Sequence, residues 1–295
     1  MTTWSLDDPT LAGLVEVGLR RRRLSAFTRR PMAVAGAIGA FAIVAVAVFA
    51  PLVAGYGPTA TDFAHLFARP LSPGHLLGSD QLGRDTFSRL VYGARSTLEI
   101  GVFATLLGTV VAVPIGLVSG FYRGWVDAVI MRLNDVVLAF PFLLIAVGLA
   151  AILGPSLRNA VIALGVAQVP GVVRIARAEA LGLREQEFVQ AAIATGASDR
   201  TVLRRYVLPN MLSPIIVQAS VAVPGAILGS ALLSFLGVGV QPPTPSWGSM
   251  LATAQTYLYQ DYWLAVFPGV AILVTTLCFN LLGDGVRDAL DPSLA

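Results

Sequence analysis

Few side chains in this sequence could carry out chemistry, and their types and spacing exclude most reactions. The 295 residues include one cysteine, Cys278, and two histidines, His65 and His75. A single cysteine cannot form a disulfide within the chain or a cysteine zinc site, and no other ligands accompany the histidines at metal-binding spacing. We therefore expect surface histidines and no metal site. The patterns HExxH and GxSxG are also missing, so we expect no catalytic residue in this chain.

The basic residues exclude one further site. All 20 of them are arginine, and the sequence contains no lysine. A nucleotide-binding loop of the type GxxxxGK[ST] needs its lysine to reach the phosphates. The sequence therefore predicts that this chain has no ATP site of that type, so an ATP-driven process would need a second chain.

The most patterned segment runs from Arg184 to Asn210 and reads REQEFVQAAIATGASDRTVLRRYVLPN. Residues 185–195 favour a helix, and Gly196 can take the left-handed conformation that ends one. Ser198 suits the cap of a second helix, which Pro209 is expected to end. Two interpretations remain open: a connector with an amphipathic helix on the membrane surface, or a site that another protein approaches. Small residues at the turn would permit a close approach: Ala191, Ala192, Ala194 and Ala197.

The rest of the chain has the composition of a membrane protein. Hydrophobic residues make up 56% of it and charged residues 13%, with a mean hydropathy of +0.75. A soluble domain carries about 25% charged residues, so a soluble enzyme is excluded. Charge-poor windows of about 20 residues, which span a bilayer as a helix, predict an all-α protein with six transmembrane helices. The predicted spans are roughly 32–55, 96–120, 130–153, 158–178, 212–236 and 263–283.

Arginine bias in the short loops predicts the orientation, with both termini in the cytoplasm. The 31 uncharged residues from Pro31 to Thr61 are too many for a cleaved signal, so the first span is expected to be retained. Outside the membrane we expect a short amphipathic helix at 80–95 and a proline-rich segment, 237–262, packed against the bundle. The predicted regions are a cytoplasmic segment 1–30, a first helix 31–56, an extracytoplasmic segment 57–94, a transmembrane domain 95–283 with a cytoplasmic loop 184–210, and a cytoplasmic tail 284–295.

Polar residues within the predicted spans are candidates for a pore or gate. Asn134 and Asp135 follow Arg132 at the inner end of the third span, where a structural network is favoured over contact with a substrate. The uncharged residues could equally join helices by hydrogen bonds or line a pore; they are Gln168, Gln218 and Asn280.

Two other classes of membrane protein are less well supported. A secondary transporter commonly shows internal repeats and intramembrane ionisable groups that carry the coupling ion. This sequence shows no repeat and few such charges. A membrane-embedded enzyme would need paired histidines or carboxylates at the interface, and none are evident.

The patterned segment resembles the EAA loop of ABC importer permeases. The family pattern of EAA, three residues, glycine, and a later hydrophobic-x-Leu-Pro corresponds to Gln190-Ala191-Ala192, Gly196 and Val207-Leu208-Pro209. In that family the loop is a coupling helix that docks into a cleft on a separate ATPase subunit. Gln190 departs from the usual glutamate, and Glu187 could supply a carboxylate one turn earlier. The resemblance implies ATPase contacts at Glu187, Gln190, Ala191, Ala192, Gly196, Ala197, Ser198 and Pro209.

Four further segments resemble the C-type subunit of dipeptide and oligopeptide ABC importers. They are HLLGSDQLGRDTFSRLVYGAR, LAFPFLL, SFLGVGVQPPTPSWGSML and FNLLGDGVRDALDP. The resemblance implies a type I importer permease fold in the bacterial cytoplasmic membrane and peptide cargo, with nickel, glutathione or another small solute as the alternative. It also implies a paralogous B-type permease, two ATPase subunits or domains that hold ATP and magnesium, and an extracytoplasmic binding protein. No cofactor bound by this chain and no nucleic acid are expected.

The predicted topology can be tested by labelling single cysteines in a Cys278→Ser background. Cysteines at Ser72 and Thr244 should react with a membrane-impermeant reagent added to intact cells, because both positions are predicted to lie outside. A cysteine at Ser198 should react only after the cells are opened. Labelling of Ser198 from outside would show that the span count is wrong.

Overall fold

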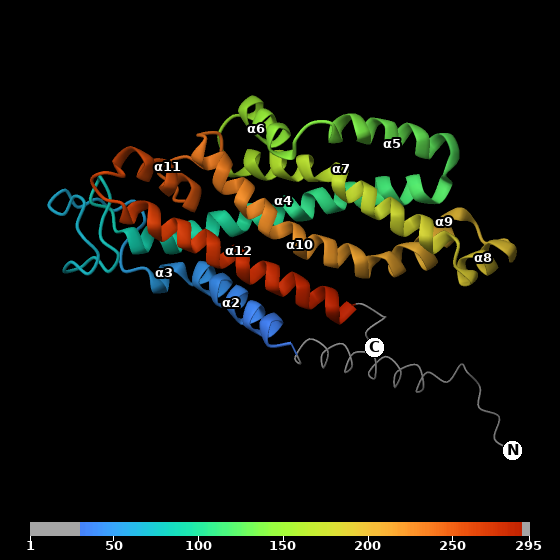
Figure 1. Ribbon diagram of the computed structural model, residues 1–295, viewed down its shortest axis with the longest axis horizontal. Helices are drawn as coiled ribbons and strands as arrows, with labels where there is room; N and C mark the ends of the chain where they lie inside the picture. Colours follow the sequence, from blue (N-terminus) through green and yellow to red (C-terminus); the bar gives the residue numbers. More distant parts are fainter. Residues whose placement is uncertain (1–29, 291–295) are drawn as a thin grey trace, which may run out of the picture.

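The computed structural model describes residues 30–290, which form a bundle of long helices (Figure 1). Within that range β-structure is limited to two isolated bridges. The long axis of the molecule has α8 and α9 at one end, and α3, α11 and the loops before α4 at the other. The elements are α2 (Pro31–Val48), α3 (Ala50–Val53), α4 (Thr86–Tyr122), α5 (Gly124–Leu138), α6 (Phe142–Leu153), α7 (Leu157–Arg184), α8 (Glu187–Ala194), α9 (Asp199–Val202), the π-helix η1 (Leu203–Val207), α10 (Leu208–Phe235), α11 (Trp247–Tyr257) and α12 (Trp263–Leu290).

Five stretches are long and apolar enough to cross a membrane: α2, α4, α7, the run from α9 through α10, and α12. A sixth crossing is reached only if α5 and α6, which are bent by 83° at their junction, count as one span. The expectation of one regular helix over 130–153 is therefore wrong. Pro141 gives the reason, because the residue before a proline is disfavoured in the helical conformation.

The second span begins earlier than the charge pattern predicts. The sequence favoured a separate amphipathic helix at 80–95, but α4 is continuous from Thr86. Asp85 caps it by accepting a hydrogen bond from the Ser88 amide at 2.7 Å. The first turns of α4 are buried against α11, where the Trp247 indole donates to the Leu90 carbonyl at 2.9 Å. This part of α4 therefore packs on the protein. Of the segment 237–262, α11 packs against the bundle as expected, but residues 242–244 and 258–260 are exposed.

Pro209 does not end the helix that starts at Asp199, contrary to the expectation from the sequence. The chain passes through η1 into α10 without a break, and Pro209 lies in the first turn of α10. A π-helical turn shifts the hydrogen-bonding pattern by one residue. This placement accommodates a residue that has no amide hydrogen to donate.

A stripe of small residues lets α4 and α7 approach closely. Gly108, Ala112, Gly116 and Gly120 recur every four residues along α4, which places them on one helix face. A Cβ atom added at Gly116 would lie 2.6 Å from the Val173 carbonyl oxygen, and one at Gly120 would lie 2.5 Å from that of Arg177. Backbone therefore packs against backbone, the arrangement that associates helices in lipid.

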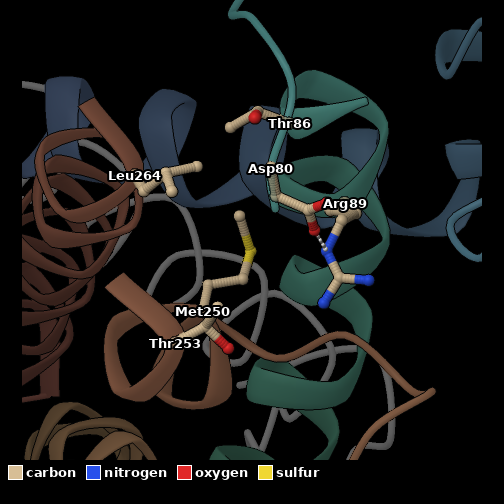
Figure 2. A pocket seen from close by; sticks show the side chains of 6 residues that line it. All are labelled: Asp80, Thr86, Arg89, Met250, Thr253 and Leu264. Carbon is tan, nitrogen blue, oxygen red and sulfur yellow. Dashed lines mark ion pairs between the residues drawn. The ribbon is translucent and has the colours of Figure 1, made fainter. Parts of the chain in front are cut away.

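The loops at the opposite end from α8, residues 54–85, fold into a compact unit that we call the cap. Its centre is Asp80, whose carboxylate accepts from the backbone amides of Leu82 and Arg84 at 2.9 and 3.0 Å. The same carboxylate pairs with Arg84 at 2.7 Å. It also lies 3.5 Å from Arg89 Nε (Figure 2). The cavity beside it measures about 10 Å³, enough for one water molecule and too small for a substrate.

The close approach of α4 and α7 predicts a large effect of a single methyl group. Gly116→Ala should destabilise the protein by about 1–3 kcal/mol, the cost of overpacking a filled interface. The measurement is the midpoint of thermal unfolding of the purified protein in detergent. Gly182→Ala is the matched control, because an added Cβ atom at this α7 position meets nothing within 4 Å. Equal midpoints for the two variants would contradict the packing described here.

Candidate functional site

The turn after α8 has the geometry that its glycine predicts. Gly196 has a φ of +84°. Its amide donates to the Ile193 carbonyl at 3.0 Å, and the Ala197 amide donates to the Ala192 carbonyl at 3.1 Å. These two bonds form a Schellman motif, which ends a helix through a left-handed residue. Ser198 stands at the cap of α9 as expected, but its hydroxyl lies 2.9 Å from Thr201 Oγ1 and does not bond a backbone amide.

One face of α8 is anchored in the protein, and the rest is exposed. Val189 and Ala192 are buried in a core cluster that also contains Leu117, Phe121 and Met211. The side chain of Ala192 is therefore covered by other residues of this chain. It does not provide the open surface for a close approach of another protein that the sequence led us to expect. The predicted contact residues that are exposed are Glu187, Gln190, Ala191, Gly196, Ser198 and Pro209, while Ala197 is half-buried.

Arginines tie this loop to the junction of α4 and α5. The Arg184 guanidinium donates to the Phe121 carbonyl and lies 5.1 Å from the centre of the Phe121 ring. Glu185 pairs with Arg123. The side-chain amide of Gln190 donates to the Arg184 carbonyl at 2.7 Å, which caps the end of α7. Arg184 and Phe121, and likewise Glu185 and Arg123, are more than 60 residues apart in sequence, so the local pattern could not reveal these two contacts.

Three polar contacts hold α5 against α7. Asp127 forms a two-pronged pair with Arg177 and also accepts from the Ser119 hydroxyl of α4. The buried Asn134 amide donates to the Pro170 carbonyl at 3.2 Å. Asp135 pairs with Arg174 at 3.0 Å, where both side chains are exposed. Polar atoms of Asn134 and Asp135 are thus engaged with α7.

Two hollows follow the surface that α7 and α10 share. The larger, about 980 Å³, lies toward the α8 end and is lined by residues such as Glu179, Pro209 and Arg287. The smaller, about 240 Å³, is lined by Gln168 together with Phe142 of α6. Gln218 lines both, so the hollows adjoin at this residue. Asn280 lines neither of them and is exposed on α12, which separates it from Gln168 and Gln218. Asn134 and Asp135 also lie outside both hollows.

The two histidines belong to the cap, and one of them is not on the surface. His75 is buried, with its Nδ1 atom 3.0 Å from the Asp85 carboxylate, which explains how a ring with polar atoms is accommodated there. His65 is exposed and lies 2.8 Å from Asp62. The hydrogen bond from His65 holds the pKa of the Asp62 carboxyl below its ordinary value. The expectation of surface histidines is therefore wrong for His75.

The sequence models of two protein families match this chain. Residues 112–295 match the binding-protein-dependent transport system inner membrane component. Residues 19–71 match the N-terminal TM domain of oligopeptide transport permease C.

Relatives are similar along nearly their whole length. The dipeptide transport system permease protein DppC of Alkalihalophilus pseudofirmus is 40% identical over 274 residues, which cover 93% of this chain and 90% of that protein. The di/tripeptide transport system permease protein DppC of Pseudomonas aeruginosa is 43% identical, covering 91% and 90%. The glutathione transport system permease protein GsiD of Escherichia coli is also 43% identical, covering 91% and 88%.

The fold also has solved counterparts. A chain of the inward-facing MetNI methionine ABC transporter superposes with a TM-score of 0.58 at 19% identity, covering 69% of this chain and 96% of that one. A chain of an amino acid ABC transporter gives a TM-score of 0.53 at 19% identity. At this identity the likeness concerns the fold alone.

Proposed function

Because the chain belongs to the family of binding-protein-dependent transport system inner membrane components, we propose that it forms part of the translocation path of an ATP-driven importer for small peptides. The observation that carries the peptide assignment is the identity of 40–43%, over at least 91% of the chain, to permeases named for dipeptides and tripeptides. The chain itself is a multi-pass membrane permease subunit. We place it in the bacterial cytoplasmic membrane.

The α8 loop is the part that would receive the energy of ATP hydrolysis. It carries an exposed surface on a buried anchor, so a force applied at α8 passes directly to α4, α7 and α10. The two partner ATPase subunits would hold ATP and magnesium, since this chain has no lysine for a P-loop. In this arrangement the α8 end lies in the cytoplasm. Its arginines, among them Arg123, Arg184 and Arg204, match the positive charge found on that side.

A second permease would complete the path. The hollows along α7 and α10 carry large apolar side chains at their margins, including Leu212 and Ile216, which are 47% and 52% exposed. Such residues suit lipid or another helix rather than water. We propose that a paralogous B-type permease covers this surface, and that an extracytoplasmic binding protein delivers the cargo at the cap.

Glutathione is the alternative cargo that a specific observation favours. The glutathione permease of Escherichia coli is 43% identical to this chain, as close as one of the peptide permeases. Glutathione is itself a small peptide, so both kinds of cargo would present amide groups and terminal charges to the permease.

ATP hydrolysis by the assembled complex tests the proposed function. The purified chain alone should hydrolyse no ATP above background. The complex with its paralogue, ATPase subunits and binding protein should hydrolyse ATP faster when a dipeptide is supplied than with glutathione or without cargo. Stimulation by glutathione and not by any dipeptide would reverse the cargo assignment. Specific ATP hydrolysis by the isolated chain would contradict the proposal that the partner subunits hydrolyse the ATP.

Gly196→Asp tests the α8 loop as the docking element. An added Cβ atom at Gly196 meets nothing within 4 Å, so the fold has room for the side chain. The positive φ costs about 1 kcal/mol for a residue other than glycine. We expect normal amounts of the variant in the membrane but little transport, because the new side chain points to where the ATPase subunit would lie.

Gly196→Ala is the matched control, because it has the same backbone strain with little bulk and no charge. It should transport better than Gly196→Asp. Gln190→Ala should also be mild, since it removes one exposed hydrogen bond to the Arg184 carbonyl. Transport by Gly196→Asp at the wild-type rate, with full coupling of ATP hydrolysis, would show that the α8 loop is not the docking element.

A further inference from the structure

Three side chains of the types that bind metal ions meet on the cap, although their spacing along the chain does not indicate a metal site. One ligand atom from each of Asp62, His65 and His75 lies within 4.8 Å of the others. The two imidazole rings have their centres 5.8 Å apart and are tilted by 57°. These residues lie outside the α8 loop and the hollows of α7 and α10, and the proposed function assigns no role to any of the three side chains.

His75 is held as a metal-ligating histidine commonly is. Its Nδ1 atom lies 3.0 Å from Asp85 Oδ1, and both side chains are buried. An ionised carboxylate can only accept a hydrogen bond, so in the neutral ring Nδ1 donates to it and Nε2 keeps its lone pair. The ring also stacks on Tyr56, with the ring centres 5.5 Å apart. A carboxylate behind a histidine fixes the tautomer and orientation of a metal ligand.

The other side of the cluster is positioned by the backbone. A Cβ atom at Gly83 would lie 1.8 Å from the Asp62 carbonyl oxygen, so only glycine lets the two segments pack this closely. The Asp62 carboxylate accepts from the Ala64 amide at 3.0 Å. The Ser79 hydroxyl donates to the His65 carbonyl. The ligands therefore come from segments that the fold already holds together.

We propose that Asp62, His65 and His75 bind a divalent transition metal ion, for which Zn²⁺ is the best match. Two imidazole nitrogens and one carboxylate oxygen are typical zinc ligands and leave a fourth position for water. Calcium and magnesium prefer oxygen ligands throughout, which this cluster does not offer. The ion would join the segment of residues 62–65 to that of residues 75–85. An ion that binds the folded cap and not the unfolded chain would stabilise the folded cap.

Zinc binding to the full-length chain in lipid nanodiscs tests this proposal. The chain is purified through a tag without histidine, in a Cys278→Ser background, so that its only thiol cannot hold the ion. It is stripped with a chelator, loaded with zinc chloride alone, freed of unbound zinc and analysed by elemental mass spectrometry. We expect one zinc ion per chain, and at least tenfold weaker binding for His65→Gln and for Asp62→Asn.

Both substitutions fall on side chains that are about half exposed, so the cap should fold in each variant. Asp261→Asn is the matched control, because it removes a carboxylate from another loop at the same end of the molecule and should bind zinc as the parent does. A second readout is protease cleavage within the cap, which zinc should slow in the parent and leave unchanged in His65→Gln. Undiminished zinc binding by His65→Gln, or no binding by the parent, would overturn the proposal and leave an ion pair only.

Discussion

The close contact between α4 and α7 is the constraint on which the rest of the fold depends. Lipid offers no hydrophobic driving force between helices, so their association relies on van der Waals contact between backbones. The small residues from Gly108 to Gly120 allow that contact along several turns of α4. Where α4 ends, the close contact allows Arg184 of α7 to donate to the Phe121 carbonyl. It also allows Arg177 of α7 to pair with Asp127 of α5, the helix that follows α4. The core on which α8 rests is built from the same two helices, with Leu117 and Phe121 on one side and Ala176 and Ala180 on the other.

This arrangement gives the α8 loop a short mechanical route to the surface that the hollows follow. Val189 and Ala192 of α8 share a core with Met211 of α10, and Gln218 lies two turns further along the same helix. On the other side, α7 carries Gln168 and also accepts the Asn134 amide at the Pro170 carbonyl. A displacement of α8 therefore acts on both walls of the hollows through packed side chains. No flexible linker intervenes, because α7 ends at Arg184 and α8 begins at Glu187.

The sequence was informative where a feature depends on composition or on neighbouring residues. Charge-free windows located the apolar helices, and a glycine followed by a capping residue located the turn at Gly196. Features that depend on distant contacts were missed. The start of α4 has mixed polarity, but its apolar side chains are buried by α11, more than 150 residues later. The approach of Gly83 to Asp62 and of Asp85 to His75 likewise has no local signature. The bend before α6 was different, since Pro141 stood in the sequence and its effect on Phe140 could have been foreseen.

The ion pair at the centre of the cap is buried and the one beside the α8 loop is exposed, which determines where the molecule can change shape. In the cap, Asp80 and Arg84 are each about 93% buried, and removing one partner of such a pair costs about 3–5 kcal/mol. At the α8 end, Arg123 and Glu185 are 40% and 62% exposed, and pairs of this kind contribute about 0–1 kcal/mol. The exposed pair of Arg123 and Glu185 can therefore break and reform as the α8 loop shifts, while the buried pair of Asp80 and Arg84 keeps the centre of the cap in place. A transporter that receives its driving force at the α8 loop and its cargo at the cap would need this difference, because one end has to move while the other remains a constant surface for recognition.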